Sequence, residues 1–90
     1  MGAKYSVDYT KAAEKLLDKM DPHNRGIIMS WVDNKLEGCT NPRAYGSSLS
    51  GDRSEEWRYR VGDYRILAKI YDDTVVIQVF KVGHRSKVYK

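Results

Sequence analysis

The stretch WRYRVGDYRI, residues 57–66, decides the fold because it encodes two strands joined by a tight turn. Apolar and charged residues alternate on both sides of Gly62-Asp63, and Gly-Asp is a good two-residue turn for a β-hairpin. The residues opposed across this hairpin are then Val61 with Tyr64, Arg60 with Arg65, and Arg58 with Leu67. Opposed residues share a face of a sheet, so the three arginines gather on one face and the apolar side chains on the other.

Further strands are predicted on both sides of this hairpin. Strand-like runs cover residues 56–61, 64–71 and 74–82, and the weak Asp-Asp turn signal at 72–73 allows a longer loop. Near the N-terminus Tyr5, Val7 and Tyr9 alternate with polar residues, which predicts a first strand.

Two helices are predicted between the first strand and the hairpin. Apolar residues between Ala12 and Met20 form one helical stripe, with Thr10 or Asp8 available as the N-cap. Asp21-Pro22 is a strong start signal for the second helix, and Gly38 is placed to end it. Residues 39–52 are rich in Asn, Pro, Gly and Ser and are predicted to be a connecting loop.

The predicted fold class is α+β, with a helical hairpin packed on a mainly antiparallel sheet in the order βααβββ. Ninety residues suffice for a single domain, residues 1–90, and are too few for a two-domain enzyme with a cleft between domains. The lone Cys39 cannot form an internal disulfide, and no Cys/His cluster has zinc-ligand spacing. No apolar run is long enough for a membrane span or a signal peptide, so a cytoplasmic location is expected.

The net charge of +4 is concentrated in the second part of the chain. Residues 1–52 carry seven basic and seven acidic side chains, whereas residues 53–90 carry nine basic and five acidic ones. Residues 81–90 alone hold four cations and no acid. A basic stretch confined to part of a small domain is typical of a protein that binds a polyanion, although a merely solvated surface has the same composition.

The rung that places Arg60 opposite Arg65 is unfavourable for the sheet, because like charges repel across it. A bound phosphate would compensate, since guanidinium groups offer paired donors that match its oxygens. The alternative is that Glu55, Glu56 or Asp63 neutralises the arginines. The register favours an anion site over that alternative.

The C-terminal residues are predicted to converge on the same arginine face. A central strand delivers the residues that follow it to a fixed place at the sheet edge, and here these include His84, Arg85 and Tyr89. Histidine is the side chain best suited to move protons near neutral pH, which makes His84 a candidate, and Tyr89 offers a hydroxyl and a stacking surface. A histidine in a loop is more often only a surface residue.

These residues carry a resemblance to a known family. The segments LSG at 49–51, WRYRVGDYRI at 57–66, VGHR at 82–85 and VY at 88–89 resemble the RelE/ParE superfamily of toxins, most closely its RelE-like members. The similarity spans nearly the whole chain, and it implies the RelE-like, microbial ribonuclease type of fold. It also implies a messenger-RNA endonuclease that acts in the ribosomal A site and is neutralised by a RelB-like antitoxin.

The resemblance assigns roles to particular positions. Basic residues of the second strand, an arginine of the third, a basic residue after the last strand and a C-terminal tyrosine carry the reaction in RelE-like members. These positions correspond to Arg58, Arg60, Arg65, Arg85 and Tyr89. RelE itself has lysines where this chain has Arg58 and Arg60, which leaves the identity of the general base open.

RNA cleavage without a metal needs a base for the 2′-OH, charge stabilisation at the phosphate and an acid for the leaving 5′ oxygen. Arginine suits the second task and, with a pKa above 12, not the first. We therefore expect the arginines to hold the phosphate, with no cofactor or metal, while His84, Tyr89 or Glu56 moves protons. The further residues expected to bind RNA phosphates are Arg53, Lys81, Lys87 and Lys90.

Two other functions fit the same sequence. One is a ParE-like toxin that poisons DNA gyrase, and the other is a non-catalytic basic RNA-binding module. The expected partners of the preferred interpretation are the ribosome, mRNA and the antitoxin, with no membrane and with DNA contacted only through the antitoxin complex. We expect the antitoxin to reach the arginine face or to disturb the C-terminal segment, through an acidic or amphipathic helix.

Overall fold

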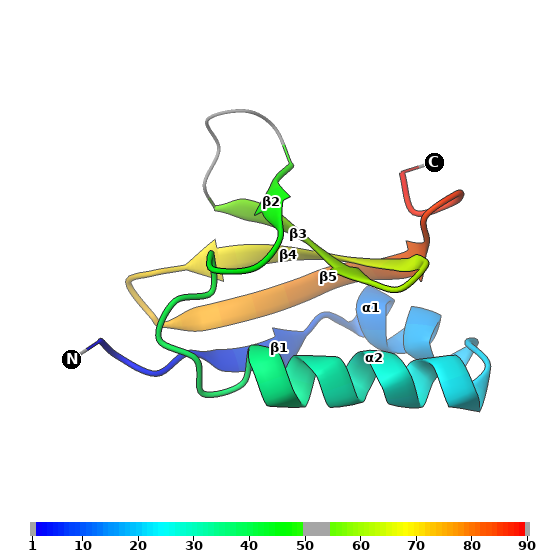
Figure 1. The fold of residues 1–90 in the computed structure, drawn as a ribbon, viewed down its shortest axis with the longest axis horizontal. Helices are drawn as coiled ribbons and strands as arrows, with labels where there is room; N and C mark the ends of the chain where they lie inside the picture. The colour runs from blue at the N-terminus through cyan, green and yellow to red at the C-terminus, as the bar shows by residue number, and fades with distance from the viewer. Residues whose placement is uncertain (1, 50–54, 90) are drawn as a thin grey trace.

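The computed structural model describes residues 2–49 and 55–89. The elements in chain order are β1 (Ser6–Tyr9), α1 (Lys11–Asp18), α2 (Pro22–Lys35), β2 (Ser47–Ser48), β3 (Glu56–Val61), β4 (Tyr64–Tyr71) and β5 (Val76–His84). The strands form one sheet in the order β1-β5-β4-β3-β2, in which β1 is parallel to β5 and all other neighbours are antiparallel. Both helices lie on the same side of this sheet (Figure 1). The predicted α+β class is confirmed.

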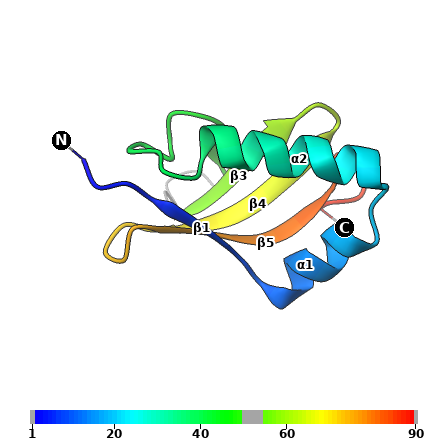
Figure 2. The same cartoon turned by 90° about the horizontal axis from the view of Figure 1, so that it is seen from below.

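The helices begin where the sequence predicts. Thr10, rather than Asp8, caps α1 by accepting a hydrogen bond from the Ala13 N–H at 3.1 Å. Asp21 caps α2 by accepting one from the Asn24 N–H at 3.1 Å. Each cap satisfies one of the N–H groups that the first turn of a helix leaves without a partner. Figure 2 shows that the two helices diverge from their short connection, with α1 beside β5 and α2 across β3 and β4.

The β3–β4 hairpin has the predicted register. Arg60 pairs with Arg65, Arg58 with Leu67, and Val61 with Tyr64. Gly62, the first of the two turn residues, has a φ of +59°. Glycine adopts this left-handed conformation without the strain that a Cβ would bring, so the sequence and the turn agree.

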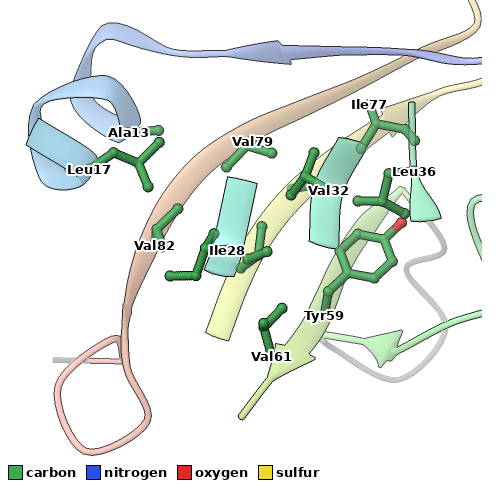
Figure 3. Close-up of a cluster of buried hydrophobic side chains, with 12 residues drawn as sticks. Ala13, Leu17, Ile28, Val32, Leu36, Tyr59, Val61, Ile77, Val79 and Val82 are labelled. Carbon is green, nitrogen blue, oxygen red and sulfur yellow. The ribbon is translucent and has the colours of Figure 1, made fainter. Parts of the chain in front are cut away.

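The core lies between the sheet and the helices (Figure 3). Its buried members are Ala13, Leu17, Ile28, Val32, Leu36, Tyr59, Val61, Ile66, Ala68, Ile77, Val79 and Val82. Tyr59 is fully buried, and its hydroxyl donates to the Pro42 carbonyl at 2.6 Å. Burial raises the pKa of this phenol well above its ordinary value. Pro42 belongs to the 39–49 loop, so this hydrogen bond ties that loop to the core.

Three details differ from the sequence prediction. The predicted loop contains β2, a strand of two residues. β5 begins at Val76 rather than at residue 74, because a four-residue loop, 72–75, ends at Val75 with a φ of +59°. β5 also continues through His84, two residues further than predicted. In the described parts of the chain, neither helix has the length and apolar character needed to cross a membrane.

An irregularity in β5 decides which way its last residues point. Ala68 pairs with Val79, but the preceding Leu67 pairs with Lys81, so Phe80 is an extra residue in β5. An extra residue in one strand reverses the alternation of side chains beyond it. As a result, Lys81 lies on the face of the sheet away from the helices, and Val82 lies in the core.

Candidate active site

The face of the sheet away from the helices, called here the open face, carries the three arginines and Lys81 in two rows. The first row runs across the strands as Ser47, Arg58, Leu67 and Lys81, and the second as Arg60, Arg65 and Gly83. The Arg60–Arg65 pair is therefore directly flanked by a glycine on β5. The predicted grouping of Arg58, Arg60 and Arg65 on one face is what the register gives.

Arg58 lies at the centre of a hydrogen-bonded group on the open face. Its Nη2 donates to the Ser47 Oγ at 2.9 Å, and its Nη1 donates to the Tyr89 hydroxyl at 3.2 Å. The guanidinium carbon also lies 6.0 Å from the centre of the Tyr89 ring, within the range of a cation–π contact. One arginine thus joins β2, β3 and the C-terminal segment.

The other arginines have fewer internal partners. Among the described residues, Arg60 makes no hydrogen bond or ion pair. Arg65 donates only to the backbone carbonyls of Gly62 and Tyr64, each at 3.1 Å. Arg85 pairs with Asp63 at 3.8 Å, and both side chains are more than 60 % exposed. Such an exposed, long ion pair contributes little, so these guanidinium groups remain available to an anion.

A tight turn brings Tyr89 over the open face. The N–H groups of Lys87 and Val88 both donate to the His84 carbonyl, at 2.8 and 2.9 Å. Val88 is buried and packs on Gly83, where an added Cβ would lie 3.5 Å from the valine side chain. Figure 1 shows this last segment rising on the side of the sheet away from the helices.

The structure places His84 away from the arginines, contrary to the sequence prediction. His84 pairs with Tyr64, and their rings lie 5.7 Å apart in an edge-to-face arrangement. Tyr64 packs against the core, so His84 lies on the helix side of the sheet. Its Nδ1 hydrogen-bonds the Ser86 hydroxyl at 2.8 Å. The extra residue Phe80 is the reason, because it reverses the alternation that would have turned His84 to the open face.

The remaining predicted residues are distributed around this group. Glu56 lies on the open face two residues before Arg58, and it is opposite Lys69. Lys81 shares the row of Arg58, and Lys87 lies with it along a groove of about 260 Å³ beside His84. Arg53 and Lys90 lie outside the described residues. Within the part of the chain that is described, no three His, Cys, Asp or Glu side chains are grouped as a metal site requires.

Residues 7–89 match the sequence model of a family described as the ParE toxin of type II toxin-antitoxin system, parDE. The chain belongs to this family of toxins. It is 26 % identical over 86 residues to Toxin RelG of Mycobacterium tuberculosis (strain ATCC 25618 / H37Rv), covering 96 % of this chain and 97 % of that protein.

Solved structures support the same assignment for the toxin. A toxin-antitoxin complex from Mycobacterium tuberculosis, RelBE2, contains a chain with a TM-score of 0.79 and 25 % identity, covering 94 % of this chain and 95 % of that one. The isolated E. coli RelE toxin has a TM-score of 0.70 at 22 % identity, covering 89 % and 83 %. The latter likeness shows a shared fold. The RelE/ParE superfamily predicted from the sequence is confirmed.

Sequence reasoning missed the part of the toxin's site that comes from β2. Gly46 has a φ of +74°, and a Cβ there would lie 2.0 Å from the Arg58 carbonyl oxygen. Only glycine allows so close an approach of the loop backbone to β3. The following residue, Ser47, is thereby placed against Arg58. A glycine and a serine in a loop rich in both gave no signal that this pair reaches the site.

Contacts on the far side of the loop hold this arrangement. The Trp57 indole donates to the Tyr45 carbonyl at 2.6 Å, next to Gly46. Arg43 donates to both oxygens of Asp72 at 3.0 Å, and the Tyr5 hydroxyl donates to the same carboxylate at 2.6 Å. The Arg43 hydrogen bonds, followed by that of Tyr5, lower the pKa of Asp72. The 39–49 loop is thus anchored to β3 and to the β4–β5 loop of the toxin, and the Tyr5 N–H, just before β1, donates to the Cys39 carbonyl of this loop.

Proposed function

We propose that this toxin is a ribosome-dependent, metal-independent mRNA endonuclease that cleaves messages in the A site and so inhibits translation. The observation that carries the proposal is the open face itself. Arg58, Arg60 and Arg65 occupy adjacent rungs there without a carboxylate partner among the described residues, and a tyrosine hydroxyl is hydrogen-bonded to Arg58. Guanidinium groups and a hydroxyl are the groups that a phosphodiester cleavage needs.

The reaction can be divided among these side chains. The ribose 2′-oxygen attacks the adjacent phosphorus and the bond from phosphorus to the 5′ oxygen breaks, which leaves a 2′,3′-cyclic phosphate and a 5′-hydroxyl. Arg60 and Arg65 stabilise the charge that develops on the phosphate oxygens. Tyr89, placed beside Arg58, gives its proton to the leaving 5′ oxygen.

The base that takes the 2′-OH proton is assigned to Glu56. It is the one carboxylate of β3, and it shares the open face with Arg58 and Arg60. His84 is not assigned a role in proton transfer because it lies on the helix side of the sheet. Arg85, beside the β3–β4 turn, together with Lys81 and Lys87, would contact the phosphates that flank the reacting one.

Dependence on the ribosome follows from the openness of this site. Arg60, Arg85 and Tyr89 are all exposed, and no second layer covers them among the described residues. An open, exposed face of this kind cannot by itself align the 2′-oxygen, the phosphorus and the leaving oxygen. Correct alignment is worth several orders of magnitude in rate, and the decoding site would supply it by fixing the message.

We also propose a cognate, RelB-like antitoxin as the partner of this cytoplasmic toxin, with DNA contacted only through their complex. Similar toxins occur in solved complexes described as RelBE2 from Mycobacterium tuberculosis and as archaeal RelE-RelB from Pyrococcus horikoshii. An acidic or amphipathic antitoxin helix would neutralise the toxin by covering the open face or by displacing residues 85–89. If this segment no longer packed on Gly83, Tyr89 would lose its contact with Arg58.

The test is primer extension on a defined message translated by purified ribosomes. The toxin should produce cleavage within codons, and the same RNA without ribosomes should remain intact. Arg60→Ala should abolish cleavage, and Lys11→Ala, which removes an exposed cation of α1 on the other side of the sheet, should not. An intact message after translation in the presence of the folded toxin would reject the proposal. Binding of the message without cleavage would instead identify a non-catalytic RNA-binding module.

A second candidate function is inhibition of DNA gyrase. The observation that favours it is the match of residues 7–89 to a family described as the ParE toxin. Supercoiling of relaxed plasmid by purified gyrase, with and without the toxin, separates the two functions. Inhibited supercoiling together with an intact translated message would establish this alternative.

A further inference from the structure

The hydrogen bonds of Arg58 determine what the neighbouring hydroxyls can do. The Ser47 oxygen accepts from Nη2 and the Tyr89 oxygen accepts from Nη1. A hydroxyl has one proton to donate, and each of these two has used only its acceptor capacity among the described residues. Neither hydroxyl donates to an acceptor in the described part of the chain, so both have a proton to offer to a bound ligand.

The Ser47 side of Arg58 also contains space and a second cation. A cavity of about 360 Å³ is lined by Gly46, Ser47, Arg58 and Arg60. Its polar side chains are donors, namely the Ser47 hydroxyl and two guanidinium groups, and no carboxylate of residues 2–49 or 55–89 lines it. A set of convergent donors with two positive charges fits an anion, and phosphate oxygens match guanidinium geometry.

We propose that Ser47 and Arg60 form a second phosphate-binding position for the RNA phosphate next to the scissile one, with Arg60, which pairs with Arg65 across the sheet, contacting both phosphates. This inference rests on the proposed function. The Tyr89 and Ser47 hydroxyls bind opposite ends of the Arg58 guanidinium. In the proposed arrangement, Tyr89 therefore contacts the scissile phosphate and Ser47 contacts the neighbouring one. Arg58 orients both hydroxyls with one N–H from each terminal nitrogen, and its other three N–H donors can face the phosphates.

A second phosphate position beside the scissile one accounts for the close approach of β2 to β3. The strand has only two residues, and its approach requires a glycine at position 46. The approach brings one hydroxyl to the end of the Arg58 guanidinium. A loop that only closed the fold would not need that contact, whereas a second phosphate position does.

The experiment measures binding of a short single-stranded 2′-O-methyl RNA, which lacks the attacking hydroxyl and cannot be cleaved. Fluorescence anisotropy over a range of salt concentrations gives both affinity and its salt dependence. Ser47→Ala should weaken binding about tenfold, the value of one hydrogen bond to a charged group, with an unchanged salt slope. Ser47→Thr should restore binding because it keeps the hydroxyl.

Arg60→Gln should weaken binding and also lower the slope of log K against log salt by about 0.7, since one phosphate contact is lost. The matched control is Ser6→Ala, which removes an exposed serine of β1 at the opposite edge of the same sheet and should change nothing. Wild-type affinity in Ser47→Ala, no rescue by Ser47→Thr, or absence of RNA binding by the unsubstituted toxin would each overturn the inference.

The outcomes separate this inference from the proposed function. If binding depends on Ser47 but translated messages stay intact, the phosphate position stands and the nuclease proposal fails. If messages are cleaved and Ser47→Ala binds and cleaves as the unsubstituted toxin does, the nuclease proposal stands and the second position is wrong.

Discussion

Replacing Gly46 by alanine tests whether the close approach of the loop to β3 builds the site. The substitution introduces two separate penalties. A φ of +74° is left-handed, which costs about 1–2 kcal/mol for a residue with a Cβ. The new Cβ would also lie 2.0 Å from the Arg58 carbonyl oxygen, a backbone atom that cannot rotate away. Overpacking of this kind typically adds about 1–3 kcal/mol.

Two other glycines separate these penalties. Gly38 has a φ of +80° but no atom within 4 Å of an added Cβ, so Gly38→Ala isolates the backbone cost of about 1–2 kcal/mol. Gly26 lies inside α2 with open space around it and no positive φ, and Gly26→Ala should stabilise the helix by about 1 kcal/mol. Gly46→Ala should be the most destabilising of the three, unless β2 detaches locally and relieves the clash.

The assay combines urea unfolding, followed by tryptophan fluorescence, with the RNA-binding measurement. The clash is relieved if the loop backbone shifts or if β2 detaches locally, and both changes move Ser47 away from Arg58. Gly46→Ala should therefore bind RNA no better than Ser47→Ala. Gly38→Ala and Gly26→Ala should bind normally. If Gly46→Ala is as stable as Gly38→Ala and keeps normal binding, the close approach has no role in forming the site.

Four further substitutions test other parts of the structure. Tyr89→Phe should lower ribosome-dependent cleavage by about 10²–10⁴-fold without a change in the urea midpoint. His84→Gln should leave the cleavage rate unchanged, because His84 lies on the helix side of the sheet. If primer extension gives the opposite result for the two variants, His84 and not Tyr89 transfers the proton. Tyr59→Phe should cost about 1–3 kcal/mol in urea unfolding, because a buried carbonyl loses its donor, and an unchanged midpoint would show that the loop is held otherwise. The pKa of Asp72 is lowered by its arginine and tyrosine partners, so its charge adds stability that is fully present above the ordinary value of 3.8 and is lost as the pH falls through the lowered pKa. Asp72→Asn should therefore lower stability by less than about 1 kcal/mol at neutral pH, since the carboxylate is exposed, and this difference should vanish in acid; a constant difference would show that charge is not its cause.

The sequence predicts well those parts of the fold that depend on local chemistry. The caps at Thr10 and Asp21 need only a side chain and an N–H three residues later. The β3–β4 register follows from a strict alternation on either side of a two-residue turn at Gly62-Asp63. Each of these signals lies within a few neighbouring residues, so tertiary contacts did not need to be known.

The parts that were missed depend on contacts between distant segments. Phe80 is an ordinary strand residue by composition, and only its place opposite Leu67 and Ala68 makes it an extra residue that turns His84 away. Similarly, Ser47 becomes part of the site because Gly46 lies against the backbone of a strand twelve residues further along, at Arg58. Neither fact is contained in a local pattern, since each requires the register between strands.

The rung formed by Arg60 and Arg65 is the strongest physical reason to expect an anion on the open face. Like charges directly opposed in a sheet are destabilising, and an intramolecular carboxylate is the usual remedy. Among the described residues the nearby Asp63 pairs at 3.8 Å with Arg85 instead, while Arg65 reaches only backbone carbonyls. The repulsion is therefore left uncompensated within the described part of the chain. A polyanion bound there would gain the relief of this repulsion in addition to its own contacts, which favours the proposed RNA site on a sheet face without a deep pocket.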